Sequence, residues 1–164
     1  LQTFTPLYLI ITADGDLGRI FGASGIFLFG FTYLYVGIAT LLKADTDGIG
    51  WYSLWVAIAA CGYGLVHLFQ LKDVKFGIIW LLWAILWFMF FLLLGLKKNI
   101  SRITGWAAIL ISWFTATIPA FLILVDAWAM ISSSLFLILT LVLLVVCIYI
   151  YAKGRETPQK GVAA

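Results

Sequence analysis

The sequence predicts an all-helical protein, a polytopic bundle of membrane-spanning helices, and three observations support this prediction. Hydrophobic residues make up 65% of the 164 residues and charged residues only 10%, whereas soluble domains are about 45–50% apolar and about 25% charged. The apolar residues fall in five long stretches, each able to cross a hydrocarbon core about 30 Å thick. The Lys and Arg residues lie between these stretches or close to their ends. Because lipid cannot satisfy backbone hydrogen bonds, the spanning segments must be helices.

Five full spans and one partial span are expected along the chain. The full spans are residues 20–42, 49–69, 76–96, 103–125 and 132–152. Residues 1–12 are apolar but too short to span and have no basic flank, so we interpret them as the second half of a helix. Short connectors place successive helices antiparallel and adjacent. The polar tail at residues 153–164 is expected to lack fixed structure.

Small residues and one proline are expected to shape how the helices pack. Glycines let helix backbones approach closely in lipid, and they occur in the first two full spans at Gly22, Gly25, Gly30, Gly62 and Gly64. Pro119 removes one backbone hydrogen bond from the fourth span, so that helix should bend. Neither feature indicates a function.

The Lys and Arg residues are distributed unequally between the two ends of the bundle. Seven fall on one side, namely Lys43, Lys97, Lys98, Arg102, Lys153, Arg155 and Lys160. Three fall on the other, namely Arg19, Lys72 and Lys75. Because basic residues favour the cytoplasmic side of a membrane, the C-terminus is expected to be cytoplasmic and the connector at residues 70–75 to face outward.

The spans contain few groups that could carry chemistry. No Asp, Glu, Lys or Arg lies well inside any span, which argues against a pump, a proton-coupled transporter or a channel with a charged ring. The single histidine, His67, cannot build a zinc site alone. Cys61 and Cys147 lie in separate spans and suggest neither a disulfide nor a metal site. We therefore expect no metal, no cofactor and no enzymatic activity.

Two spans carry aromatic residues at helical spacing. These residues are Phe27, Phe31 and Tyr35 in the first full span, and Phe76, Trp80, Trp83 and Trp87 in the third. Each run lies on one face of its helix. The pattern fits a pore lining and helix packing about equally, although the tryptophans lie too deep for an interfacial belt. A pore of this kind suits a small, flat, neutral solute such as urea and rejects a hydrated ion, because nothing repays dehydration of the ion.

Several segments, in order and at compatible spacing, resemble the urea channel/amide transporter family (AmiS/UreI). They are residues 28–35 (LFGFTYLY), 50–57 (GWYSLWVA), 76–87 (FGIIWLLWAILW), 104–106 (TGW) and 115–120 (TATIPA). The resemblance extends over about residues 1–128 and is nearer to the amide-transporter branch. The family's first helix and the start of its second helix have no counterpart in this sequence.

The resemblance implies a six-helix protomer, a pore through each protomer and a homo-hexameric ring. It further implies passive passage of urea or short aliphatic amides across the cytoplasmic (inner) membrane of a bacterium, with a functional link to a cytoplasmic amidase or urease. The family's pore-lining positions match Phe31, Tyr35, Trp80, Trp83, Leu86 and Trp87. Helix position alone suggests Thr32, Ser112 and Thr115 as additional polar contacts.

The sequence departs from the family pattern in three respects. The acid-gated urea channels carry a glutamate where an ungapped match places Ile111, followed here by Ser112. The outer connectors are short and only His67 lies near them, so gating by several histidines is not expected. A further span follows the family core, which divides the chain into a core at residues 1–128, an additional helix at 129–152 and a cytoplasmic tail at 153–164.

These observations leave two main hypotheses. The first is a passive channel for small neutral amides through an aromatic-lined pore. The second is a non-transporting membrane subunit of a larger complex, which the additional helix and the absent mid-helix acid favour. A membrane enzyme is the least favoured reading, because a bound metal or cofactor would be needed to support it.

Overall fold

A computed structural model describes residues 1–156, with side chains through Lys153, and over this range the chain contains helices and no strand. The α-helices are α1 (Phe4–Ile11), α2 (Leu17–Leu41), α3 (Asp47–Phe69), α4 (Val74–Phe90), α5 (Ser101–Ser112), α6 (Ile118–Leu124) and α7 (Ser133–Glu156). Two π-helical segments, η1 (Phe91–Gly95) and η2 (Trp113–Thr117), continue α4 and α5, and a 3₁₀ turn, η3 (Trp128–Met130), precedes α7. The prediction of an all-helical chain is confirmed.

Five segments are long and apolar enough to cross a membrane, as predicted. They are Leu17–Leu41, Asp47–Phe69, Val74–Gly95, Ser101–Leu124 and Ser133–Lys153. The largest difference from prediction is the start of the first span, at Leu17 rather than at residue 20. Helix α7 continues to Glu156, so the first residues of the expected tail are helical, and residues 157–164 lie outside the described part of the chain.

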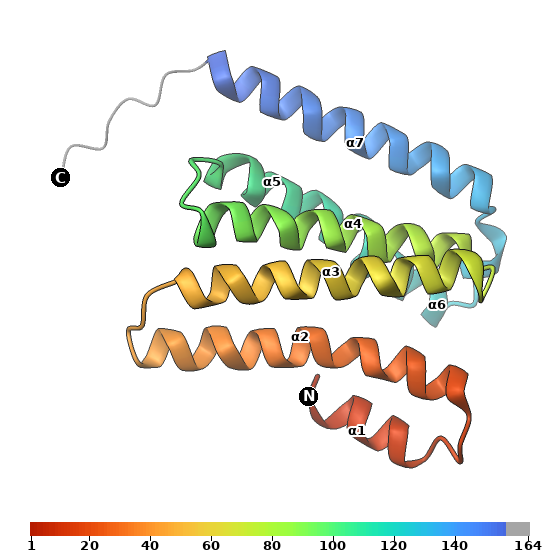
Figure 1. Cartoon of the computed structure of the whole chain (residues 1–164). Helices are drawn as coiled ribbons and strands as arrows, with labels where there is room; N and C mark the ends of the chain where they lie inside the picture. Colours follow the sequence, from red (N-terminus) through yellow and green to blue (C-terminus); the bar gives the residue numbers. More distant parts are fainter. Residues whose placement is uncertain (157–164) are drawn as a thin grey trace.

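The helices form a row in which neighbours along the chain are mostly neighbours in space (Figure 1). Helix α1 packs on α2, α3 packs along the whole of α4 and η1, and α7 packs on α5 and α4. The N-terminal α1 and the C-terminal α7 therefore lie at opposite edges of the bundle (Figure 1). The connectors containing Lys43 and Lys97 lie at the same end of the row as the C-terminal end of α7, and we call this end the Lys97 end.

Short polar residues define where the helices begin and how the connectors turn. The Asp16 carboxylate caps α2 by accepting hydrogen bonds from the backbone nitrogens of Gly18 (2.8 Å) and Arg19 (3.1 Å). Asp73 caps α4 in the same way through the nitrogen of Phe76 (3.0 Å). Each of the five connectors contains one non-glycine residue with positive φ, and these are Asp14, Lys43, Lys72, Lys97 and Asp126.

Two pairs of glycines bring α3 into close contact with α4 and with η1. A Cβ atom on Gly50 would collide with the backbone nitrogen of Gly95, and a Cβ atom on Gly64 would lie 3.3 Å from the carbonyl oxygen of Gly77. Gly62 has open space around it. Gly64 therefore allows the close helix approach that was expected of the glycines, whereas Gly62 makes no such contact.

The fourth span is not one continuous α-helix. It passes from α5 through the π-helical η2 into α6, and Pro119 lies in the first turn of α6. The irregularity that Pro119 was expected to cause thus lies in the turn before it, where wider π hydrogen bonding accommodates the missing N–H. π-helical turns of this kind are often found at functional sites.

A buried apolar cluster joins the additional helix to the family core. Ile78, Ile79 and Leu82 of α4 pack with Ala107 and Ile111 of α5 and with Phe136 of α7. Ile111 is only 3% exposed. The position where the acid-gated relatives are expected to carry a glutamate is therefore occupied here by a buried core residue.

Candidate functional site: an aromatic seam between α2 and the α3–α4 pair

Eight ring-bearing side chains fill the space between α2 and the paired helices α3 and α4, and we call this group the aromatic seam. Its members are Phe21 and Phe29 of α2, Tyr63 and His67 of α3, and Phe76, Trp80, Trp83 and Trp87 of α4. None of them is an acidic or permanently cationic residue. The seam runs from the ends of α3 and α4 near His67 towards the middle of the bundle.

The rings of the seam touch one another in an unbroken series. Tyr63 stacks on Phe21 and on Trp80, with ring centroids 4.6 Å apart in both pairs and interplanar angles of 28° and 22°. Trp80 meets Trp83 edge to face at 5.7 Å, and Phe29 presents its edge to Trp83 at 4.1 Å. Aromatic pairs with these separations are mutually attractive. The series therefore has ordered ring faces rather than loosely packed side chains.

A glycine on α2 makes room for the seam. A Cβ atom on Gly25 would lie 2.6 Å from the indole ring of Trp80 and 3.3 Å from the ring of Tyr63. Any larger residue at this position would push Trp80 away from α2. Gly25, one of the glycines expected to mediate backbone contact, therefore meets side-chain rings instead.

Two polar groups of the seam, the Tyr63 hydroxyl and the Trp83 indole N–H, have hydrogen-bond partners. The hydroxyls of Ser24 and Tyr63 lie 2.5 Å apart. The indole Nε1 of Trp83 donates to the hydroxyl of Thr115 at 2.5 Å, and that hydroxyl donates to the carbonyl of Ile111 at 2.6 Å. Nδ1 of His67 is buried and has no hydrogen-bond partner among the described residues.

A second, smaller group of aromatic side chains lies nearer the Lys97 end, between α2 and the first turns of α3. The rings of Tyr35 and Tyr52 meet edge to face at 5.6 Å, and Tyr52 also contacts Trp55 at 5.6 Å. Thr32 is 4% exposed, and its hydroxyl donates to the carbonyl of Leu28 at 2.6 Å. Gly48 leaves space for the Tyr35 hydroxyl, which a Cβ atom would obstruct.

The structure brings some of the predicted pore-lining residues together and separates others. Trp80, Trp83 and Trp87 all contact Phe29 within the seam. Phe31 is 47% exposed and stacks on Phe27 at 5.3 Å, on the other flank of α2.

The other predicted pore-lining residues, Tyr35 and Leu86, lie in different parts of the bundle. Tyr35 lies near the Lys97 end beside Tyr52. Leu86 packs against the buried cluster of α4, α5 and α7. Among the three suggested polar contacts, Thr32 and Thr115 are buried, whereas Ser112 is exposed and donates to the carbonyl of Ile109.

Sequence reasoning did not identify Phe29, Tyr63 or Tyr52. Phe29 is two residues from Phe31, and residues two apart on a helix point in nearly opposite directions. Tyr63 lies four residues before His67, which places both on the same face of α3. This spacing was the available signal, because it aligns two polar rings in the second half of that span.

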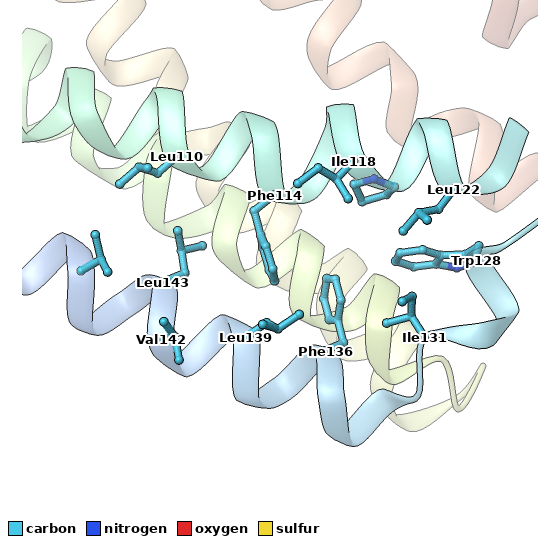
Figure 2. Close-up of a pocket in the computed structure, with 12 residues that line it drawn as sticks. Leu110, Phe114, Ile118, Leu122, Trp128, Ile131, Phe136, Leu139, Val142 and Leu143 are labelled. Carbon is cyan, nitrogen blue, oxygen red and sulfur yellow. The ribbon is translucent and has the colours of Figure 1, made fainter. Parts of the chain in front are cut away.

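A separate cavity of about 390 Å³ lies between α5, η2 and α6 on one side and α7 on the other (Figure 2). Phe114 and Phe136 stack across it at 4.8 Å, and Trp128 meets the edge of Phe136 at 5.7 Å. Twelve residues line it, and apart from the Trp128 indole they present hydrocarbon groups. This cavity lacks the hydrogen-bonding groups that an amide would need.

The described residues contain no group of three or more His, Cys, Asp or Glu side chains that could hold a metal ion. The candidate site consists instead of ring faces, hydroxyls, the indole N–H groups of its three tryptophans and one imidazole. Such an arrangement can contact a flat neutral molecule on its faces and exchange a small number of hydrogen bonds with its edges.

Comparison with known proteins finds similarity over most of the chain. The family model described as AmiS/UreI family transporter matches residues 1–127. The putative transporter protein AmiS2 of Rhodococcus erythropolis is 54% identical over 125 residues, which covers 76% of this chain and 61% of that protein. A putative amidate substrates transporter protein of Mycolicibacterium smegmatis is 51% identical over 130 residues, covering 78% of this chain and 61% of that protein.

More distant relatives include a protein of known structure. The acid-activated urea channel of Helicobacter pylori is 34% identical over 130 residues, covering 73% of this chain and 67% of that protein. The cryo-EM structure of the Helicobacter pylori urea channel in the closed state superimposes with a TM-score of 0.65 and 29% identity, covering 77% of this chain and 76% of that one. These relatives are described as transporters or channels and not as enzymes.

The chain spans 61% of the length of each of the first two relatives, and helix α7 lies beyond the matched residues. The match nevertheless includes every residue of the aromatic seam and its Thr115 partner. On the extent of the family match and the identity to these relatives, the chain belongs to the AmiS/UreI family of transporters.

Proposed function

We propose that this chain forms a passive membrane channel for small neutral amides, namely short aliphatic amides and urea. The observation that carries the proposal is the aromatic seam, an unbroken series of ring faces that includes no acidic or permanently cationic side chain. The relatives support the same solute class, since they are described as a transporter of amidate substrates and as a urea channel.

The chemistry of the seam matches the chemistry of an amide. A primary amide is planar and uncharged, so it can pass along ring faces at little desolvation cost compared with an ion. Its carbonyl and N–H groups need only a few hydrogen bonds in exchange for those it loses to water. A hydrated ion would find neither counter-charges nor a ring of carbonyls to replace its water shell.

The proposed pore-lining residues are Phe31, Tyr35, Trp80, Trp83, Leu86 and Trp87, with Thr32, Ser112 and Thr115 as polar contacts. Trp80, Trp83 and Trp87 have the strongest support, because they face Phe29 within the seam. Tyr35 and Thr32 are supported by their position near the Lys97 end. Phe31, Leu86 and Ser112 are the weaker members of the set, since each lies outside the seam.

We further propose a homo-hexamer in the cytoplasmic (inner) membrane of a bacterium, with the Lys97 end towards the cytoplasm. The basic residues Lys43, Lys97 and Lys98 at this end support the orientation. The C-terminus would then be cytoplasmic. A cytoplasmic amidase or urease would consume the solute. Residues 1–128 would form the channel core, residues 129–152 an additional membrane helix and residues 153–164 a tail.

The alternative is a non-transporting membrane subunit of a larger complex. It is favoured by α7, which lies beyond the family match, covers part of α4 and α5 and exposes many large apolar side chains. An assembled oligomer that does not conduct amides would support this alternative.

Stopped-flow uptake into proteoliposomes tests the proposal. Urea and acetamide should enter vesicles that contain the protein faster than empty vesicles, without an ion gradient and with little saturation. Uptake no faster than in the empty control, from protein shown to be an assembled oligomer, would reject a channel for this solute class.

A further inference from the structure

The cavity between the fourth span and α7 is open along one side and lined almost entirely by hydrocarbon groups (Figure 2). We call it the α7 cavity. It has a volume of about 390 Å³ and offers almost no hydrogen-bonding group to an amide. Water does not suit it either, because a cavity without polar partners stays dry. The lining therefore selects an apolar molecule.

The length of the α7 cavity matches one leaflet of a bilayer. Its lining on α7 extends from Phe136 to Val146, ten positions or about 15 Å along the helix. Its lining on the fourth span extends from Leu110 to Leu122, or about 18 Å. Since the hydrocarbon core is about 30 Å thick, one leaflet contributes about 15 Å. The cavity can therefore accommodate an extended acyl chain from one leaflet.

The open side of the α7 cavity faces lipid. Its two walls are the fourth span and α7, which are both long and apolar enough to cross a membrane. Phe136 is 3% exposed and stacks on Phe114 at the base of the cavity, whereas Ile118 and Val142 are 48% and 55% exposed. Exposed side chains of a membrane span meet lipid tails, because the bilayer is the solvent of the span. A lipid tail can therefore enter the cavity from the side.

One end of the α7 cavity has a group that can bind a phosphate. Trp128 and Ile131 line this end, and the ammonium group of Lys75 donates to their carbonyls at 2.8 and 3.0 Å. An ammonium group has three N–H donors, so one is not used by these two bonds. Lys75 is also partly exposed. Trp and Lys side chains are favoured where hydrocarbon meets the lipid head groups, so this end suits the head group of a phospholipid.

The other charges at this end do not exclude a phosphate. The connector before α4 contains Lys72 and Asp73, and the connector before α7 contains Asp126. With Lys75 they amount to two positive and two negative charges. The Asp73 carboxylate caps α4 by accepting a hydrogen bond from the nitrogen of Phe76. This balance selects neither anionic nor zwitterionic lipids, and the phosphate that both contain is the group available to Lys75.

We propose that the α7 cavity binds one acyl chain of a phospholipid from the leaflet opposite the Lys97 end, with the lipid phosphate at Lys75. The acyl chain lies along the stacked pair of Phe114 and Phe136 and fills the space between α7 and the fourth span. The bound lipid thereby holds α7 on the family core. The inference goes beyond the proposed function, because none of these contacts involves the aromatic seam or an amide.

Native mass spectrometry tests the proposal by counting the lipid that the full chain retains in mild detergent after extraction from vesicles of phosphatidylethanolamine and phosphatidylglycerol. The unmodified protein should retain about one phospholipid per chain. Leu139 lines the cavity, and Leu139→Trp should lower retention at least about tenfold, because the larger ring displaces acyl methylenes. Leu137→Trp is the matched control, since Leu137 is 46% exposed, compared with 43% for Leu139, and lies outside the lining. It should retain lipid as the unmodified protein does.

Thermal unfolding of delipidated protein provides a second measurement that does not depend on the variants. Added phosphatidylglycerol should raise the unfolding temperature of the unmodified protein, since a ligand of the folded state stabilises it. Glycerol phosphate, which has no acyl chain, should have no effect. Leu137→Trp should respond to phosphatidylglycerol like the unmodified protein, and Leu139→Trp should respond less.

Three results would overturn the lipid site. They are equal lipid retention by the two tryptophan variants, absence of phospholipid from the unmodified protein, and an equal response of the unmodified protein to phosphatidylglycerol and glycerol phosphate. If the unmodified protein retains no lipid and Leu139→Trp alone disrupts the oligomer, the cavity is a contact with a second copy of the chain. Amide uptake is not measured here, so failure of the lipid site leaves the proposed channel function unaffected.

Discussion

The indole nitrogen of Trp83 donates a hydrogen bond to the hydroxyl of Thr115, 2.5 Å away, and thereby joins α4 to the π-helical segment η2. The Thr115 hydroxyl in turn donates to the carbonyl of Ile111, so its acceptor side faces Trp83. Thr115 is 4% exposed. This hydrogen-bonded pair fixes the orientation of the Trp83 ring, which meets the Phe29 ring edge to face.

Replacing Thr115 by Val should destabilise the protein by about 1–2 kcal/mol, because the indole N–H of Trp83 is left without a partner. Thermal unfolding in detergent measures the loss. Trp83→Phe in the same background removes the N–H as well, so the double variant should lose less than the sum of the two single variants. Strict additivity would show that the hydrogen bond contributes little.

The contact between Gly50 and Gly95 should tolerate no side chain. In Gly50→Ala the new methyl group would meet the backbone of Gly95, which cannot move aside as a flexible side chain can. We expect a loss of at least about 1–3 kcal/mol. Gly62→Ala is the matched control on the same helix, because nothing lies within 4 Å of its Cβ position. It should be neutral or stabilising by up to about 1 kcal/mol. Equal thermal stabilities for the two variants would contradict the packing of α3 on η1.

Lys75 anchors the connection between the family core and α7. Its ammonium group donates to the carbonyls of Trp128 (2.8 Å) and Ile131 (3.0 Å) and lies 4.2 Å from the centroid of the Trp128 ring. Lys75→Met should therefore make the connector around η3 easier to cleave by protease. The exposed Lys72, replaced by Met, is the control and should leave cleavage unchanged. Identical cleavage in both variants would show that the anchor is not required.

Amide uptake should depend little on pH between about 5.5 and 7.5. The only histidine of the chain is His67, and ordinary carboxyl, Lys and Arg groups do not titrate in this interval. Initial acetamide uptake in buffers across the interval should vary by less than about twofold, since one isolated histidine makes no multi-site switch. A steep rise of uptake on acidification would contradict this expectation.

Much of the fold could be predicted from the sequence because lipid imposes a simple rule on the chain. Each span must be apolar and helical, so hydropathy alone places the five spans close to their observed ends. The two π-helical segments were not predicted, since hydropathy does not distinguish π-helical from α-helical turns. Pro119 indicated that the fourth span would depart from regular α-helix. It did not indicate that the departure would be the π-helical segment η2, which ends just before the proline.

The site was less predictable because periodicity identifies a helix face without showing what that face contacts. The run Trp80, Trp83 and Trp87 does lie together, since all three project towards α2. On α2 the sequence pattern favoured Phe31, whereas the ring that meets the tryptophans belongs to Phe29. The partners Thr115 and Tyr63 come from other helices, and only the tertiary arrangement brings them to Trp83 and Trp80.

The measurement that tests the central claim most directly is uptake of acetamide and urea by Trp83→Ala protein in proteoliposomes. Trp106→Ala, which removes an indole 44% exposed on α5, serves as the control. If the seam is the route, Trp83→Ala should change the ratio of acetamide to urea uptake by a factor on the order of ten, because the removed ring would contact the methyl group that acetamide carries in place of one amino group of urea. The oligomer should stay assembled and the control should match the unmodified protein. Unchanged uptake of both solutes by assembled Trp83→Ala protein would contradict the account and assign Trp83 to packing alone.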